Sequence, residues 1–177
     1  GPQGMPQCTW AQVRQYVGTR GRKLMIRAVP DGEENPLFEQ TFAAFKAYYG
    51  EHCLDHTLPY PDVLNVMKEL KGRGIKIAIV SNKLDSAVKE LDEKFFAEYT
   101  TAAIGEMEGV ARKPAPDMVE KALRELGVAK SDAVYVGDSD VDIQTAQNSG
   151  LDCISVTWGF RDVPFLREHG AKTMIDK

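Results

Sequence analysis

The stretch "AVYVGDSDVDIQTAQNSG", residues 133–150, decides the fold class of this chain. A short run of apolar β-forming residues leads directly into three aspartates, Asp138, Asp140 and Asp142, and then into residues with helical spacing. Like charges so close together raise each other's pKa unless a cation lies among them. The pattern therefore predicts a buried strand with a cation at its carboxyl end and a helix that begins there. Asp140 is expected to cap that helix or to be solvated.

The same alternation of strand and helix extends on both sides of this stretch. It predicts parallel βαβ units, and hence an α/β sheet with helices on both faces. Residues 5–58 differ, because they show helical spacing and almost no strand signal. The expected strands of the second part are residues 75–82, 99–105, 133–138 and 152–159, and the expected helices are residues 61–74, 86–96, 115–127, 141–150 and 163–170.

Composition and charge exclude several classes of function. The net charge of -4 implies no basic face, which argues against a general nucleic-acid binder. No apolar run approaches the roughly 20 residues that a membrane span needs, and no signal peptide is visible. Cys8, Cys53 and Cys153 are odd in number and lack metal-like spacing, so we expect reduced thiols in a cytoplasmic protein. No pattern predicts the oligomeric state.

Polar residues follow the predicted strands, at the edge of the sheet where ligands bind in such folds. Ser81 and Asn82 follow one strand, the aspartate cluster follows another, and Lys113 precedes a helix in "ARKPAPD". Magnesium takes carboxylates together with water and substrate oxygens, and a lysine ammonium acts on phosphate as a point charge. Phosphoryl transfer needs mainly such positioning and charge neutralisation. These residue types therefore indicate a site for magnesium and a phosphoryl group.

Three segments, "IVSNK", "RKPAPD" and "YVGDSDVDIQTAQNSG", resemble in order the second, third and fourth motifs of the haloacid dehalogenase superfamily. The segment "LPYPDVLNVMKELKGRGIKIAIVSNK" is similar to the phosphoglycolate-phosphatase branch of that superfamily. The resemblance implies a Rossmann-like parallel sheet core, residues 59–177, and a small α-helical cap domain, residues 5–58.

The resemblance also implies a role for each residue that matches a motif. Ser81 would bind the phosphoryl group, Lys113 would stabilise the charge of phosphate and nucleophile, and Asn82 would support the loop or a phosphate oxygen. Asp138 would ligate magnesium, and Asp142 would orient that metal shell. The implied activity is magnesium-dependent hydrolysis of small phosphorylated metabolites such as phosphoglycolate.

One motif of the superfamily has no counterpart in these residues. Its members begin with a strand that ends in Asp-x-Asp-Gly-Thr, whose first aspartate is the nucleophile. Residues 1–58 contain only Asp31 and Asp55, and neither follows an apolar strand. We therefore expect the first core strand to be missing and the nucleophile of the aspartyl-phosphate to lie outside this chain. The alternative is a catalytically incomplete fragment or pseudo-enzyme that binds magnesium and phosphate without turnover.

The segment "VGTRGRKL", residues 17–24, is the candidate substrate-binding part of the cap. Its two glycines allow a tight loop, from which Thr19, Arg20 and Lys23 are predicted to contact an anionic substrate. A solvated turn is the alternative interpretation. Phe38, Phe42 and Phe45 are predicted to form the apolar core of the cap.

Overall fold

A computed structural model of the chain describes residues 8–9, 21–52 and 57–176. The chain divides into two compact units, Gly1–Leu58 and Pro59–Lys177. No helix in the described ranges is long and apolar enough to cross a membrane.

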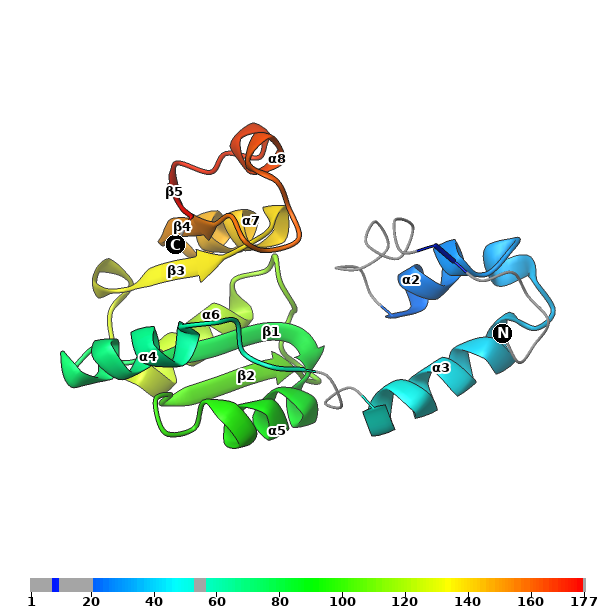
Figure 1. The fold of residues 1–177 in the computed structure, drawn as a ribbon, viewed down its shortest axis with the longest axis horizontal. Coiled ribbons are helices and arrows are strands. Elements are labelled where there is room, and N and C mark those ends of the chain that lie inside the picture. Colours follow the sequence, from blue (N-terminus) through cyan, green and yellow to red (C-terminus); the bar gives the residue numbers. More distant parts are fainter. Residues whose placement is uncertain (1–7, 10–20, 53–56, 177) are drawn as a thin grey trace. The chain divides into compact units, whose positions relative to one another are not determined.

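The first unit is helical throughout its described part. It contains α2 (Gly21–Ala28), the 3-10 helix η1 (Gly32–Glu34) and α3 (Phe38–His52) (Figure 1). Met25 and Val29 of α2 and the loop after it pack against Phe38, which is 1% exposed, with Phe42 and Phe45 around them. The aromatic spacing along α3 therefore supplies the core of this unit, as the sequence predicts.

Of the segment 17–24, the structure describes residues 21–24, which belong to α2. A tight loop before α2 lies outside the described residues. Arg22 forms ion pairs of 2.6 Å with Glu33 and with Glu39, and its guanidinium lies 5.0 Å from the centre of the Phe38 ring. The helical spacing of the apolar residues after Arg22 includes this turn. The Arg22 side chain therefore forms its ion pairs with residues of its own unit.

The second unit alternates strands and helices, as expected from its sequence. Every predicted strand and helix is present, with ends that differ by a few residues, and a further short strand ends the unit (Figure 1). The elements are α4 (Val63–Gly72), β1 (Ala78–Leu84), α5 (Asp85–Phe95), β2 (Ala102–Glu106), α6 (Asp117–Leu126), the 3-10 helix η2 (Lys130–Asp132), β3 (Val134–Gly137), α7 (Asp140–Ser149), β4 (Asp152–Val156), α8 (Val163–Glu168) and β5 (Thr173–Ile175).

The strands form two parallel sheets instead of the single sheet that the alternation predicts. One sheet has the order β1-β2 and the other β3-β4-β5. Within the described residues, β1 therefore has one edge without a partner strand, and so has β3. Val134 and Val136 of β3 are 53% and 56% exposed. This split agrees with the expected absence of one core strand, because a parallel strand at the edge of a sheet leaves backbone groups and apolar side chains uncovered.

Helix α6 packs against both sheets and fixes their relative position. Its residue Met118 is fully buried beside Ile104 of β2, while Val119 and Leu123 pack against Tyr135 of β3. Burial of a large apolar side chain contributes about 2 kcal/mol to folding. The shared helix therefore holds the two sheets in one core although their strands do not pair.

Candidate active site

A buried ion pair joins the residues that follow β2 to helix α7. The Nζ atom of Lys113 donates to Oδ1 of Asp142 at 2.7 Å, and the two side chains are 12% and 8% exposed. Tyr135 of β3 donates its hydroxyl to the same oxygen at 3.0 Å and accepts from Lys113 Nζ at 3.1 Å. The ammonium is therefore held at a defined place by two partners.

The second oxygen of Asp142 is also engaged. Its Oδ2 accepts from the Ser139 hydroxyl at 2.6 Å and from the backbone N–H of Asp138 at 3.2 Å. Burial of the carboxylate raises its pKa, but the charge of Lys113 and the hydrogen bonds outweigh that effect and hold the pKa of Asp142 below its ordinary value of 3.8. Asp142 is thus a carboxylate whose two oxygens already have partners.

Asp138 directly follows β3 and has a half-buried side chain. Its Oδ2 accepts from the backbone N–H of Phe160 at 3.1 Å, and its Oδ1 accepts no hydrogen bond from any described residue. A Cβ atom at Gly159 would lie 2.1 Å from Asp138 Oδ2, and one at Gly137 would lie 2.3 Å from Asp142 Cβ. Both carboxylates therefore occupy space that only glycine leaves open.

Ser81 and Asn82 lie in the last part of β1. The Asn82 side chain donates to the backbone carbonyl of Lys113 at 3.0 Å and accepts from the backbone N–H of Lys113 at 2.9 Å. The hydroxyl of Ser81 accepts from the N–H of Lys83 at 3.2 Å, which leaves its own proton for a further acceptor. A continuous network thus runs from Asn82 through Lys113 to Asp142 and spans the carboxyl ends of β1 and β3.

The three predicted substrate-binding residues belong to the first unit. Thr19 and Arg20 lie outside the residues that the structure describes. Lys23 is an exposed residue of α2. A substrate contact by any of the three stays a prediction.

Three members of the network were not identified from the sequence. Tyr135 has the spacing of a core residue in its strand, and nothing local indicates that its hydroxyl faces Asp142. The Phe160 contact is made by its backbone N–H, so the residue type at this position does not predict the contact. Ser139 could have been predicted from the sequence. A serine followed three positions later by an acidic residue, here Ser139 and Asp142, is the pattern of an N-capped helix start.

The donor set fits a magnesium ion held through few protein ligands. Among the described residues, no group of three or more His, Cys, Asp or Glu side chains lies close enough to form a metal cage. Magnesium does not need one, because water and substrate oxygens complete its shell. The open Oδ1 of Asp138 suits a direct ligand, whereas the hydrogen bonds of Asp142 suit the orienting role.

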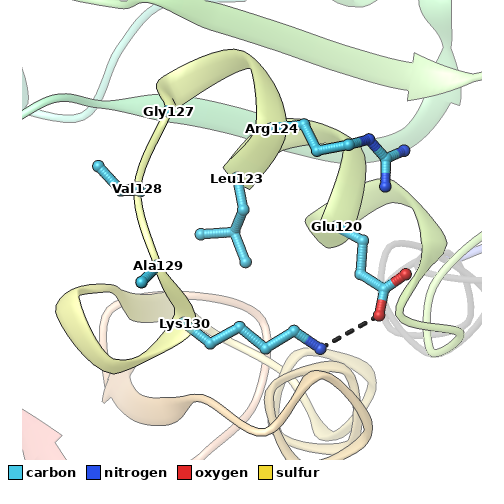
Figure 2. Close-up of a pocket in the computed structure, with 7 residues that line it drawn as sticks. All are labelled: Glu120, Leu123, Arg124, Gly127, Val128, Ala129 and Lys130. Atoms are coloured by element: carbon cyan, nitrogen blue, oxygen red, sulfur yellow. Dashed lines mark hydrogen bonds and ion pairs between the residues drawn. The ribbon is translucent and has the colours of Figure 1, made fainter.

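A surface pocket of about 390 Å³ lies elsewhere, at the end of α6 (Figure 2). Leu123 and Val128 line it, and the Glu120–Lys130 ion pair of 3.1 Å closes one side. None of the predicted site residues contributes to it. Since Lys113 precedes the start of α6 and the pocket surrounds its last turns, the pocket is separate from the network.

Comparison with known proteins gives the class to which this fold and network belong. The family model of haloacid dehalogenase-like hydrolases matches residues 2–156, so the chain belongs to that family. It is 33% identical over 166 residues to the phosphoglycolate phosphatase of Rhodobacter capsulatus, with 91% of this chain and 74% of the relative covered. It is 32% identical over 149 residues to that of Aquifex aeolicus, with 84% of this chain and 68% of the relative covered.

A solved structure extends the similarity to the fold. A crystal structure from Lactobacillus delbrueckii subsp. bulgaricus, provisionally assigned as a phosphoglycolate phosphatase, aligns with a TM-score of 0.90 at 36% identity. The alignment covers 99% of this chain and 83% of that one. The chain is thus a haloacid dehalogenase-like hydrolase that is similar to phosphatases.

Proposed function

We propose that this chain serves as a magnesium-dependent phosphatase of small phosphorylated metabolites such as phosphoglycolate. The observation that carries the proposal is the Lys113–Asp142 ion pair, 2.7 Å long, beside Asp138 at the carboxyl ends of β1 and β3. The names of the relatives from Rhodobacter capsulatus and Aquifex aeolicus support phosphoglycolate as a member of the substrate class.

Each network residue has a distinct part in this proposal. The Lys113 ammonium, oriented by Asp142 and Tyr135, stabilises the negative charge of the phosphoryl group. The Ser81 hydroxyl donates to a phosphoryl oxygen, and Asn82 fixes the backbone of Lys113. Magnesium, held by Asp138, would neutralise the charge that develops on the phosphoryl oxygens.

The nucleophile is proposed to come from outside these residues. The chain contains no Asp-x-Asp-Gly-Thr sequence that could form the aspartyl-phosphate. Among the described residues, β1 and β3 each have an edge without a partner strand, which supports this proposal, because a parallel strand paired there would have its carboxyl end on the same side as those of β1 and β3. The same observation favours the second candidate function, a chain that binds magnesium and phosphate without turnover.

A complementation experiment separates the two candidates. The chain is assayed for hydrolysis of phosphoglycolate and of p-nitrophenyl phosphate, with and without magnesium. A synthetic peptide with an apolar strand ending in Asp-x-Asp-Gly-Thr is then added, and the same peptide with its first aspartate replaced by asparagine is the control. We expect turnover only with the first peptide and magnesium, and none from the Asp138→Asn variant.

Binding measurements complete the test. If the peptide induces no turnover while calorimetry still detects magnesium and phosphate binding, the second candidate is favoured. A folded chain that binds neither ion contradicts both candidates. Turnover by the chain alone, dependent on Asp138, would place the nucleophile within these residues.

We also propose a cytoplasmic location. Cys8 and Cys153 are free thiols, and such thiols are typical of reducing compartments. Fractionation of the cells that produce the protein tests this location.

A further inference from the structure

The loop between β4 and α8, residues 157–162, contacts the side chain of Asp138. The N–H of Phe160 donates to Asp138 Oδ2 at 3.1 Å, and Gly159 leaves the space that this carboxylate occupies. At its start, the loop is attached to the sheet by the N–H of Thr157, which donates to the carbonyl of Ile175 at 3.1 Å. The orientation of Asp138 therefore depends on where this loop lies.

At its other end the loop is attached through Arg161. The Nε atom of Arg161 lies 3.3 Å from Oδ1 of Asp140, and its guanidinium lies 4.9 Å from the centre of the Phe165 ring of α8. Asp140 is the first residue of α7, two positions after Asp138. The capping role expected for Asp140 belongs to Ser139. The buried Oδ1 atom of Asp140 has no hydrogen-bond partner among the described residues, and the ion pair with Arg161 is its contact with this loop.

We propose that Arg161 is a positioning residue for Asp138. Through its ion pair with Asp140, it holds the loop at the distance at which the Phe160 N–H engages Oδ2 and leaves Oδ1 for a divalent cation. The inference deepens the proposed function and rests on the magnesium role proposed there for Asp138. Partners behind a metal ligand that fix its orientation commonly matter for metal affinity.

The direction in which removal of Arg161 changes magnesium affinity distinguishes a positioning role from a purely electrostatic one. Arg161 is a cation near a cation site, so by Coulomb repulsion alone its removal would strengthen magnesium binding. A positioning role predicts that removal of Arg161 weakens magnesium binding. Loss of the Asp140 link releases the loop, and magnesium affinity is expected to fall about tenfold.

The experiment measures two properties of the full chain. Calorimetry gives magnesium affinity, and amide hydrogen exchange in the absence of metal gives the protection of the Phe160 N–H. The variants are Arg161→Ala, Arg161→Lys and, as a control of equal charge change, Arg167→Ala, an exposed arginine of α8 with no ion pair in the described structure. Arg161→Ala is expected to weaken magnesium binding and to speed Phe160 exchange, whereas Arg167→Ala changes neither.

Arg161→Lys is expected to restore part of both properties, because lysine can pair with Asp140 but cannot reproduce the planar guanidinium contact with Phe165. In an Asp140→Asn background, Arg161→Ala should change Phe160 exchange less than it does in the parent, since the ion pair is already broken and only the contact with Phe165 is left to lose.

Each outcome decides the inference. Unchanged Phe160 exchange in Arg161→Ala overturns it, and so does magnesium binding that is unchanged or stronger in that variant. If the unsubstituted chain binds no magnesium, the proposed magnesium role is wrong. The exchange of Phe160 then decides by itself whether Arg161 holds the loop.

Discussion

Lys113 Nζ lies 2.7 Å from Oδ1 of Asp142, and both side chains are almost fully buried. Lys113 follows β2 of one sheet, and Asp142 lies in the helix after β3 of the other. The pair therefore joins the two sheets at the point where the candidate site lies. A buried charge that loses its partner is costly, so the same contact affects both stability and function.

Removal of the ammonium is expected to destabilise the chain. Lys113→Met leaves the Asp142 carboxylate buried without its cation and should lower the free energy of unfolding by about 3 kcal/mol. Urea denaturation followed by circular dichroism measures this change. Lys121→Met, which removes a more exposed ion pair with Glu125 on α6, is the control and should cost less than about 1 kcal/mol. Equal losses in the two variants would contradict the prediction.

Acid is expected to destabilise the fold through Asp142 and Asp85. The pKa of each lies below 3.8 in the folded chain: burial raises it, but ion pairs and hydrogen bonds with Lys113 and with Lys89 outweigh burial. The unfolded chain therefore binds these protons more readily, so this stabilisation is present above about pH 4 and is lost as the pH falls below it.

Urea titrations at a series of pH values from neutral to acid measure this dependence. Asp142→Asn should show a shallower loss of unfolding free energy below about pH 4, because one of the two titrating groups is gone. The slope is the informative quantity, since the variant also loses its ion pair. Identical slopes for variant and parent would exclude Asp142 as a source of acid sensitivity.

Gly159→Ala is expected to displace the loop that holds Asp138. The new Cβ would lie 2.1 Å from Asp138 Oδ2, a separation that forces the loop or the carboxylate to move. Magnesium affinity, measured by calorimetry, should fall by about tenfold or more. Gly72→Ala is the matched control: its Cβ would meet nothing within 4 Å, and alanine at that helical position should stabilise by about 0.5–1 kcal/mol. A similar magnesium affinity in both variants would be evidence against the close approach.

Tyr135→Phe removes the hydroxyl that contacts both Lys113 and Asp142. The expected loss of unfolding free energy is about 1 kcal/mol, the usual net contribution of an intramolecular hydrogen bond. Burial and the charge of Asp142 raise the pKa of Tyr135 far above its ordinary value of 10.0. An alkaline absorbance titration should therefore show the same number of phenols ionising near pH 10.0 in parent and variant. One fewer in the variant would mean that Tyr135 is accessible to solvent.

Local sequence signals predict most elements of the second unit. The apolar run before Asp138 becomes β3, and the helical spacing after it becomes α7. Such elements follow from the periodicity of neighbouring residues, which acts over a few positions. The same signals place Asp138 directly after a strand, Asp142 in the helix that follows it and Lys113 before a helix, where the structure has them.

Long-range pairing is where sequence reasoning is insufficient. The alternation of elements alone predicts one sheet, whereas the described strands form two, a split that agrees with the absence of one core strand expected from the family resemblance. In the first unit, the contacts of Arg22 with Glu33 and Glu39 join residues 11 and 17 positions apart, and no local signal predicts them.

The sequence by itself predicted which residues could carry the proposed chemistry, from residue type, position after a strand and resemblance to the family motifs. Only the tertiary structure decided which of those residues contact one another. Asn82 and Lys113 are 31 positions apart, and Lys113 and Asp142 are 29 apart, yet each pair is hydrogen-bonded. Contacts over such separations exist because α6 packs against both sheets, and that packing is a property of the whole core.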